Sequence, residues 1–305
     1  MRLEFRIPIS PTPAFYSQVR LIALSLQRLG PPYSEADIRV LVGDRAAGPD
    51  VEARNAWSSR YPVVWDAVPG DVCERLGLAA PGLSRYTAPS VADVVILCDA
   101  DTCPIARFDE LLGMLAGTHP KVAGVQAHYS PFVPPSQMTW QQLLDAIGQP
   151  ASLCDQRYSL DVYGEHGLAP RYFNYGFVAF NAAAFRLIAP AYERYAALAM
   201  DKMPGSPFFA QIGLTLAMLD NGVEIIGLGH EYNCANDDRI SQHDLVELND
   251  IRIIHYLRTG EFDRHNFLCD REKYEEFSGI EKRNIISERL RQHVLAIPDA
   301  FVEWE

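Results

Sequence analysis

The stretch DVVILCDADTCPI, residues 93–105, decides the fold class of this chain. Its apolar run from Val94 to Cys98 has the length and β-branched content of a buried strand. Asp99 and Asp101 follow directly, and side chains two residues apart point the same way in an extended chain. Two carboxylates that face one point suit Mg²⁺ or Mn²⁺. The alternative interpretation is that both aspartates only end the strand and cap a turn.

Around this stretch, short runs rich in valine and isoleucine alternate with helical patterns, which predicts an α/β fold with a mainly parallel central sheet. We expect strands at Leu3–Ile9, Ile38–Val42, Pro62–Trp65, Val94–Cys98, Val122–Ala127, Phe177–Phe180, Glu224–Gly227 and Arg252–His255. We expect helices at Tyr16–Leu29, Phe108–Ala116, Ala191–Met203, from Ser206 to Asn221, and near Ile280–Ile297 within a C-terminal helical segment at about 278–297.

Residues 129–171 differ in texture from the rest of the chain. They are rich in proline and glycine and carry one short helical patch around Trp140–Ile147. Long excursions from a sheet are often binding loops. We therefore expect a single domain over residues 1–305 with this loop-rich excursion, rather than two domains.

The composition narrows the range of partners. The 305 residues include 27 Lys and Arg against 39 Asp and Glu, a formal net charge of −12. This balance disfavours a sequence-independent nucleic-acid binder and a protein drawn to anionic membranes. An acidic protein can still bind a phosphorylated ligand if a metal or a local basic cluster supplies positive charge. We therefore expect no nucleic-acid partner.

The cysteines and the apolar segments bear on location. The six cysteines are scattered without a CxxC pair, which excludes a zinc ribbon of that spacing. No window approaches the length of about 18 apolar residues that a membrane span requires, and the N-terminus lacks the apolar stretch of a signal peptide. We expect a reduced, cytoplasmic protein without a membrane span.

Three further segments carry candidate site residues. FNYGFVAFN, residues 173–181, contains Asn174 and Gly176 just before an apolar strand, and Gly176 would allow a ligand to approach the backbone closely. Gln211 stands among apolar neighbours on a predicted helix, so it is either a hydrogen-bonded core amide or faces a site. His255 ends an apolar strand, where a lone histidine is more often structural. Near a carboxylate pair it becomes a plausible metal ligand through its neutral imidazole.

Together these segments resemble the A-type glycosyltransferase fold, a Rossmann-like nucleotide-diphospho-sugar transferase fold, which implies a mixed, mainly parallel central sheet. They are most similar to glycosyltransferase family 8, which includes glycogenin and the bacterial lipopolysaccharide galactosyltransferases. The segment SRYTAPSVADVVILCDADTCPI, residues 84–105, matches the family's arginine-containing segment and Asp-x-Asp motif, with Arg85 in the arginine position. Asn174-Tyr175-Gly176 matches its Asn-x-Gly segment, and Gln211 and His255 fall at its helix glutamine and late histidine. The resemblance runs to about residue 265.

The resemblance implies a hexosyltransferase-type enzyme that moves a sugar from a nucleotide-diphospho-sugar, of the UDP-sugar type, to an acceptor. The acceptor could be a saccharide, a protein or a small molecule. By the same resemblance Asp99, Asp101 and His255 would hold Mn²⁺ or Mg²⁺ against the diphosphate, with Arg85 and Arg258 adding hydrogen bonds to phosphate. Gly176 would lie against the donor.

Two pairs of positions complete the implied site. Asn174 and Gln211 would be the catalytic residues, bonding the sugar's hydroxyls or its reacting face. The nucleotide base would lie near the first strand and its following loop, from Ile7 to Tyr16, and near Asp44. The resemblance implies retention of anomeric configuration, with the leaving phosphate helping to deprotonate the acceptor.

The chain departs from the family pattern at three places. Ala210 precedes Gln211 where the family commonly has aspartate, which removes a carboxylate nucleophile and favours front-face retention. Arg258 and Gly260 follow His255, and no Lys-Pro appears after them. Residues 129–171 carry no family signature. An inverting route would need a general base from that excursion, for which Asp155, Asp161 or Glu165 could serve.

Two other functions remain open from the sequence. A sugar-phosphate nucleotidyltransferase also uses acidic residues and a metal, but resembles a family with a glycine-rich, basic first loop, whereas residues 9–18 read ISPTPAFYSQ. A non-catalytic nucleotide-sugar-binding protein of the same fold would bind its ligand without turnover.

Overall fold

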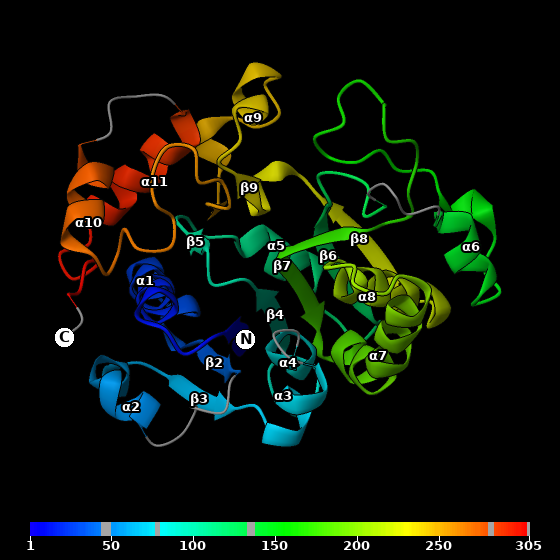
Figure 1. Ribbon diagram of the computed structural model, residues 1–305, viewed down its shortest axis with the longest axis horizontal. Helices are drawn as coiled ribbons and strands as arrows, with labels where there is room; N and C mark the ends of the chain where they lie inside the picture. Colours follow the sequence, from blue (N-terminus) through cyan, green and yellow to red (C-terminus); the bar gives the residue numbers. More distant parts are fainter. Residues whose placement is uncertain (44–49, 77–79, 133–137, 280–283, 304–305) are drawn as a thin grey trace.

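The computed structural model describes residues 1–43, 50–76, 80–132, 138–279 and 284–303. The main-sheet strands in these ranges are β1 (Leu3–Ile9), β2 (Asp37–Val42), β3 (Val63–Ala67), β4 (Val94–Cys98), β6 (Lys121–Gln126), β7 (Phe173–Asn181) and β8 (Glu224–Leu228). They form a seven-stranded sheet in the order β3-β2-β1-β4-β7-β6-β8 (Figure 1). β7 is antiparallel to β4 and β6, and the remaining neighbours are parallel. The predicted mixed, mainly parallel sheet is confirmed.

A second sheet of three short strands within the described ranges stands at the carboxyl end of β4. Its members are β5 (Thr102–Pro104), β10 (Ile253–His255) and β9 (Cys234–Ala235), in the order β5-β10-β9. The sequence predicted β10 but neither β5 nor β9. Strands of two or three residues are too short to show an alternating pattern, so only their pairing with β10 defines them.

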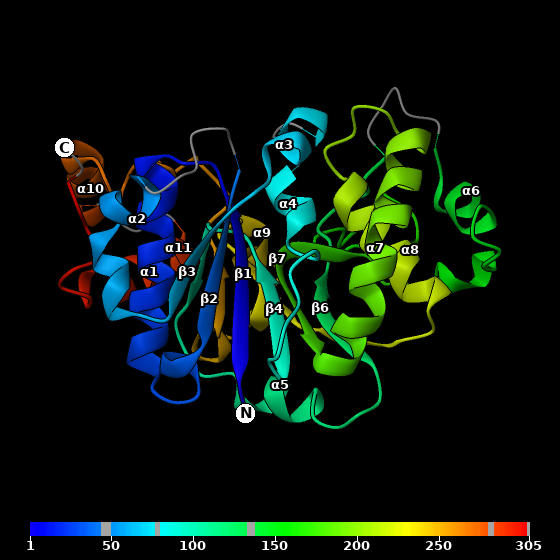
Figure 2. The same cartoon turned by 90° about the horizontal axis from the view of Figure 1, so that it is seen from below.

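The helices cover both faces of the main sheet. Their bounds are α1 (Pro13–Leu29), α2 (Asp50–Arg54), α3 (Gly70–Leu76), α4 (Ala80–Ser84), α5 (Asp109–Met114), α6 (Trp140–Asp145), α7 (Ala182–Lys202), α8 (Phe209–Asp220), α9 (Asp238–Gln242), α10 (Arg271–Ser278) and α11 (Ile285–Leu295). The α7 helix begins nine residues before the predicted Ala191, because Asn181 caps it by accepting the N–H of Ala184 at 2.9 Å. The α7 and α8 helices pack against each other beside β7 and β6 (Figure 2).

The pleat of β4 divides the core into two layers. Val94, Ile96 and Cys98 pack with α1 and α5 on one face, whereas Val95 and Leu97 pack with α7 and α8 on the other. All five side chains are buried. A strand that is apolar on both faces reads as a continuous hydrophobic run, which is why the sequence located β4 without error.

The C-terminal helices form a third apolar cluster with α1 and the second sheet. Leu21 and Leu24 of α1 meet Phe277 of α10 and Leu290 of α11, and the views agree that α10 and α11 lie beside α1 (Figures 1 and 2). Asn284 caps α11 by accepting the N–H of Ile286 at 2.8 Å, so this helix begins after the predicted start. Ile280 lies outside the described residues. In the described ranges, no helix is both long and apolar enough to cross a membrane.

Candidate functional site

Asp99, Asp101 and His255 come together at the carboxyl end of β4. One ligand atom from each lies within 4.8 Å of the others. The chain does not reach this arrangement in the extended form that the sequence predicted. Residues 100 and 101 form a turn, which the Thr102 hydroxyl closes by donating to the Asp99 carbonyl at 2.8 Å. Both interpretations of the two aspartates therefore hold: they end the strand in a turn, and their carboxylates converge.

Strand pairing brings His255 to the carboxylates. In the antiparallel pair of β10 and β5, His255 stands opposite Thr102, and the N–H of Tyr256 donates to the Asp101 carbonyl at 3.0 Å. The imidazole Nε2 then lies 3.2 Å from Oδ1 of Asp101. A register shift of one residue would turn this side chain to the opposite face of the small sheet.

The cluster opens to solvent on the side of Asp99. The side chains of Asp99, Asp101 and His255 are 35%, 16% and 6% exposed. Burial raises the pKa of Asp99, with Asp101 adding to the rise and Arg85 opposing it. Burial would also raise the pKa of Asp101, but His255 and Arg264 beside it lower that pKa below its usual value. The two carboxylates thus differ in environment, and His255 and Arg264 favour the ionised form of the inner one.

Arg85 is a buried cation beside Asp99. Its Nη2 donates to Oδ1 of Asp99 at 3.2 Å, and its guanidinium lies 4.9 Å from the centroid of the Tyr175 ring. Arg6 fixes the segment that carries it, since Nη1 of Arg6 donates to the Arg85 carbonyl at 2.7 Å. Nε and Nη1 of Arg85 are buried without a hydrogen-bond partner. Two donor nitrogens of a charged, buried side chain therefore have no hydrogen-bond partner in the structure.

The other two arginines of the region have different partners. The predicted phosphate ligand Arg258 bonds Asp237, with Nε at 2.9 Å and Nη2 at 2.7 Å from the same Oδ2. Arg264, which the sequence analysis did not identify, instead donates from Nη1 to Oδ2 of Asp101. Nε of Arg264 is buried without a partner. Of these two arginines, the one that contacts the carboxylate cluster is thus Arg264, nine positions after His255, where no local motif would reveal it.

Asn174 and Gly176 meet the cluster from β7. Oδ1 of Asn174 accepts the N–H of Gly176 at 2.8 Å and Nδ2 of Asn233 at 3.0 Å, and Oδ1 of Asn233 lies 3.0 Å from Nδ1 of His255. A Cβ on Gly176 would lie 2.2 Å from Nδ1 of His255. Gly176 therefore permits the close approach of the His255 imidazole, whereas the sequence predicted the close approach of a ligand.

Gln211 stands in the first turn of α8, directly after Ala210. The Ala210 carbonyl accepts the hydroxyls of Tyr175, at 2.7 Å, and Tyr192, at 3.1 Å. Tyr175 lies between Asn174 and Gly176, so these bonds fasten the start of α8 to the site end of β7. The structure assigns Gln211 no direct contact with the described carboxylates.

Of the residues predicted near the nucleotide base, Ile7 and Tyr16 have buried side chains. Ile7 is fully buried in the middle of β1, and Tyr16 is 2% exposed with its ring 5.8 Å from that of Trp65. Neither side chain is open to solvent. Between them, Thr12 and Pro13 are the exposed residues. Asp44 lies outside the described residues.

Asp161, one of the three candidate bases for an inverting route, has a structural role. Its carboxylate oxygens accept the N–H groups of Glu165 at 2.8 Å and His166 at 2.9 Å. Burial would raise the pKa of Asp161, but these backbone bonds lower it below the usual value. A carboxylate held in this way is a poor proton acceptor. Asp155 accepts a bond from the neighbouring Gln156 and lies at the surface.

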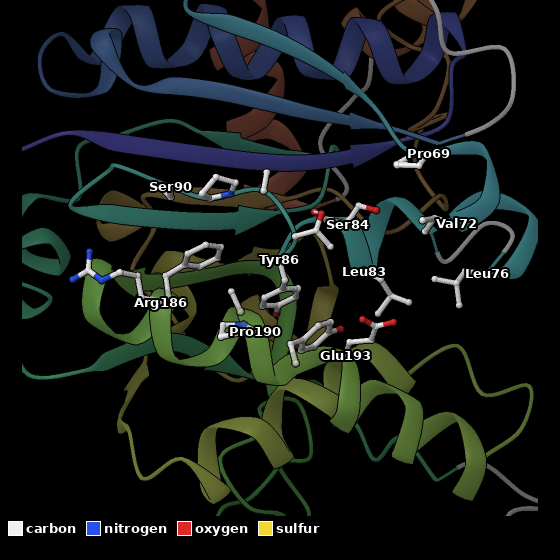
Figure 3. Close-up of a pocket in the computed structure, with 16 residues that line it drawn as sticks. Pro69, Val72, Leu76, Leu83, Ser84, Tyr86, Ser90, Arg186, Pro190 and Glu193 are labelled. Carbon is white, nitrogen blue, oxygen red and sulfur yellow. Dashed lines mark hydrogen bonds between the residues drawn. The ribbon is translucent and has the colours of Figure 1, made fainter.

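A separate cavity of about 630 Å³ lies behind Arg85, between the α3–β4 segment and α7 (Figure 3). Ser84 and Tyr86, the neighbours of Arg85, line it together with Arg186 and Pro190 of α7. None of the three clustered metal-ligand candidates is among its described lining residues. Tyr86 stacks on Tyr192 with ring centroids 3.7 Å apart, which separates the cavity from Tyr175 and the carboxylate site.

Comparison with known proteins identifies the fold. Neither the protein-family models nor the curated protein sequences gave a match. Among solved structures, the chain is similar to the galactosyltransferase LgtC in complex with donor and acceptor sugar analogs, with a TM-score of 0.55 and 15% identity over 98% of this chain and 96% of that chain.

Two further glycosyltransferase structures share the fold. Mouse xyloside xylosyltransferase 1 in its apo form aligns with a TM-score of 0.52 and 13% identity, over 84% of this chain and 98% of that one. The glycosyltransferase GlyE of Streptococcus pneumoniae TIGR4 aligns with a TM-score of 0.52 and 11% identity, and all of this chain matches 62% of that one. The A-type glycosyltransferase fold predicted from the sequence is therefore confirmed.

Proposed function

We propose that this protein is a metal-dependent glycosyltransferase that uses a nucleotide-diphospho-sugar, of the UDP-sugar type, as donor. One observation carries the proposal: two carboxylates and an imidazole converge within 4.8 Å at the carboxyl end of β4. Ligands of open α/β sheets bind outside the carboxyl ends of the strands. The glycosyltransferase fold supports this proposal by analogy.

The three residues fit a divalent cation by their chemistry. Asp99 and Asp101 supply hard oxygen ligands and His255 supplies a nitrogen, a set that suits Mn²⁺ and also accommodates Mg²⁺. The imidazole of His255 occupies the space that a Cβ at position 176 would need, so a glycine in β7 allows the histidine to lie at the site. A divalent cation held there would act as a Lewis acid on the departing diphosphate.

Arginine side chains would bind the donor on either side of the carboxylates. Arg85 has two buried donors without partners next to Asp99, and Arg264 has one next to Asp101. Charge-assisted bonds from these groups to phosphate or sugar oxygens would satisfy donors that are costly to leave unpaired. Arg258 could contribute only after loosening its pair with Asp237.

Asn174 and Gln211 would hold the sugar. The Oδ1 atom of Asn174 is engaged by Gly176 and Asn233, which leaves its NH₂ group as the part that would donate to a sugar hydroxyl. Ala210 supplies no carboxylate, and its carbonyl is bonded by two tyrosine hydroxyls. This favours retention at the front face of the sugar, in which the leaving phosphate takes the acceptor's proton.

The test is release of UDP from a panel of UDP-sugars with and without Mn²⁺. Asp101→Asn keeps the size of the side chain but removes a charge, and we expect turnover to fall on the order of 100-fold. Asp201→Asn is the matched control, because Asp201 is an exposed aspartate of α7 paired with Lys202. Undiminished turnover by folded Asp101→Asn would remove the proposal.

Two further measurements separate the alternative functions. Release of pyrophosphate from a nucleoside triphosphate would indicate a nucleotidyltransferase, and saturable binding of a nucleotide-sugar without turnover would indicate a binding protein.

We also propose a cytoplasmic location, which the six free thiols support. The excursion over residues 129–171 is our proposed acceptor side of a single domain.

A further inference from the structure

We propose that Asn233 is a positioning residue that fixes the tautomer of His255, so that the imidazole presents a bare Nε2 towards Asp101. The inference rests on the proposed metal role of His255 and extends it to a residue outside the metal-ligand set. Asn233 is fully buried and directly precedes β9. It contacts His255 of β10 on one side and Asn174 of β7 on the other.

A backbone N–H can only donate, and the N–H of Gly176 fixes the orientation of both asparagine amides. The N–H of Gly176 points at one terminal atom of the Asn174 amide at 2.8 Å, so that atom must be the oxygen. The atom of Asn233 that lies 3.0 Å from the same oxygen must then be its NH₂ nitrogen. The amide orientation of both asparagines follows from the bonds they make.

The orientation of Asn233 in turn determines the ring. Its other terminal atom is the oxygen, which lies 3.0 Å from Nδ1 of His255 and can only accept. Nδ1 must therefore carry the proton. In the neutral ring Nε2 is then left with a lone pair, 3.2 Å from a carboxylate oxygen of Asp101. Two acceptors that face each other in this way favour a cation between them. The hydrogen bond from Nδ1 to Asn233 would hold the ring in the orientation that binds such a cation.

The geometry leaves the ring no easy alternative. The backbone of Gly176 is so close that an added Cβ would meet Nδ1 at 2.2 Å and Oδ1 of Asn233 at 2.7 Å. Rotation of the imidazole is therefore opposed by β7, and rotation of the Asn233 amide would set its oxygen against Oδ1 of Asn174. The contacts act together, since each bond fixes the direction of the next.

The primary experiment is ¹⁵N NMR of protein labelled at histidine, without metal or nucleotide, with His255 assigned by comparison with His255→Gln. At a pH at which the ring is neutral, we expect the proton on Nδ1 of His255 and none on Nε2. A proton on Nε2 alone would overturn the inference. This readout does not depend on transfer activity, so it stands whether or not the proposed function holds.

Three variants test the role of Asn233. Asn233→Leu removes the acceptor, and we expect loss of the fixed Nδ1 proton and a decrease in Mn²⁺ affinity of about 10-fold to 100-fold. Asn233→Asp keeps an acceptor towards Nδ1, and we expect it to restore the Nδ1 proton and at least the wild-type affinity.

Asn236→Leu is the matched control, because Asn236 is similarly buried and bonds the backbone of Arg258 instead. We expect this variant to lose stability with no change in tautomer or affinity. An unchanged ring in Asn233→Leu, or equal effects of Asn233→Leu and Asn236→Leu, would refute a positioning role. Wild-type protein that shows the Nδ1 proton but binds no Mn²⁺ would contradict the proposed function alone.

Discussion

Arg264 donates a hydrogen bond from Nη1 to Oδ2 of Asp101, although 163 positions separate the two residues in the sequence. The same carboxylate faces His255 through its other oxygen, at 3.2 Å. Both oxygens of the inner carboxylate thus lie close to nitrogen groups, and the Arg264 guanidinium places positive charge where a metal cation bound by Asp101 would also place it. This pairing links the proposed metal site to the segment that follows β10.

Arg264→Gln should bind Mn²⁺ more tightly than the wild type when no nucleotide is present. The substitution removes a cation that competes for Asp101, and we expect a gain on the order of tenfold, or about 1.4 kcal/mol. The same variant should bind UDP more weakly in the presence of Mn²⁺, because a phosphate ligand is lost. Titration calorimetry measures both. Arg258→Gln is the control, since it removes an equal charge that is paired with Asp237. Equal gains in the two variants would contradict the specific competition.

Gly176→Ala should damage the site without an added charge. The new Cβ would overlap Nδ1 of His255, and overpacking of this kind costs about 1–3 kcal/mol of unfolding free energy. We expect a lower melting temperature together with weaker Mn²⁺ binding. Gly113→Ala in α5 is the control: its Cβ would have no neighbour within 4 Å, and alanine in a helix should be neutral or stabilising. A Gly176→Ala protein with wild-type stability and affinity would show that the imidazole is free to move.

Arg85→Lys should lower kcat/KM for the donor by about 10-fold to 100-fold, because lysine lacks the planar fork that can bond Asp99 and a ligand at once. The charge is retained, so the loss would report on geometry. Steady-state kinetics with the best UDP-sugar measures it. Arg28→Lys, an exposed change near the end of α1 and far from the carboxylates in sequence, serves for comparison. Full activity of Arg85→Lys would contradict this prediction and show that the site needs only a positive charge at this position.

The unfolding free energy should decrease in acid partly through His293. Burial, with Arg28 and Arg289 adding to it, lowers the pKa of His293 to about 4, and its Nε2 lies 2.9 Å from the Ser25 hydroxyl. The unfolded chain therefore binds more protons than the folded chain between about pH 6.5 and pH 4. The stabilising contribution is complete above that window and is lost as the pH falls, by about 1.4 kcal/mol per pH unit.

Urea unfolding of His293→Gln at several pH values checks this. We expect a shallower dependence on pH within the window, while His119→Gln, whose side chain is 65% exposed, should follow the wild type. An identical slope in His293→Gln and the wild type would assign the acid sensitivity to other groups. Buried His128, with a pKa lowered to about 3 by burial and by His255, accounts for part of the remaining slope.

The sequence by itself determined the order of the main strands along the chain and the residue types of the site. β1 and β4 have the predicted bounds because an apolar run buried on both faces needs no tertiary information. The pairing of Asp99 and Asp101 with His255 was predicted through the resemblance to glycosyltransferase family 8, because a lone histidine at a strand end is by itself more often structural. The sequence overestimated extension at residues 99–101, where a side-chain hydroxyl closes a turn.

Only the tertiary structure decided how these residues meet. The register of β10 against β5 places His255 beside Asp101, and hydrogen-bonded register between segments 150 positions apart leaves no local pattern. Arg264, Asn233 and the steric role of Gly176 escaped prediction for the same reason, because each depends on atoms contributed by another strand. Ile7 and Tyr16 lie close in sequence to the end of β1, but tertiary packing buries both side chains in the core.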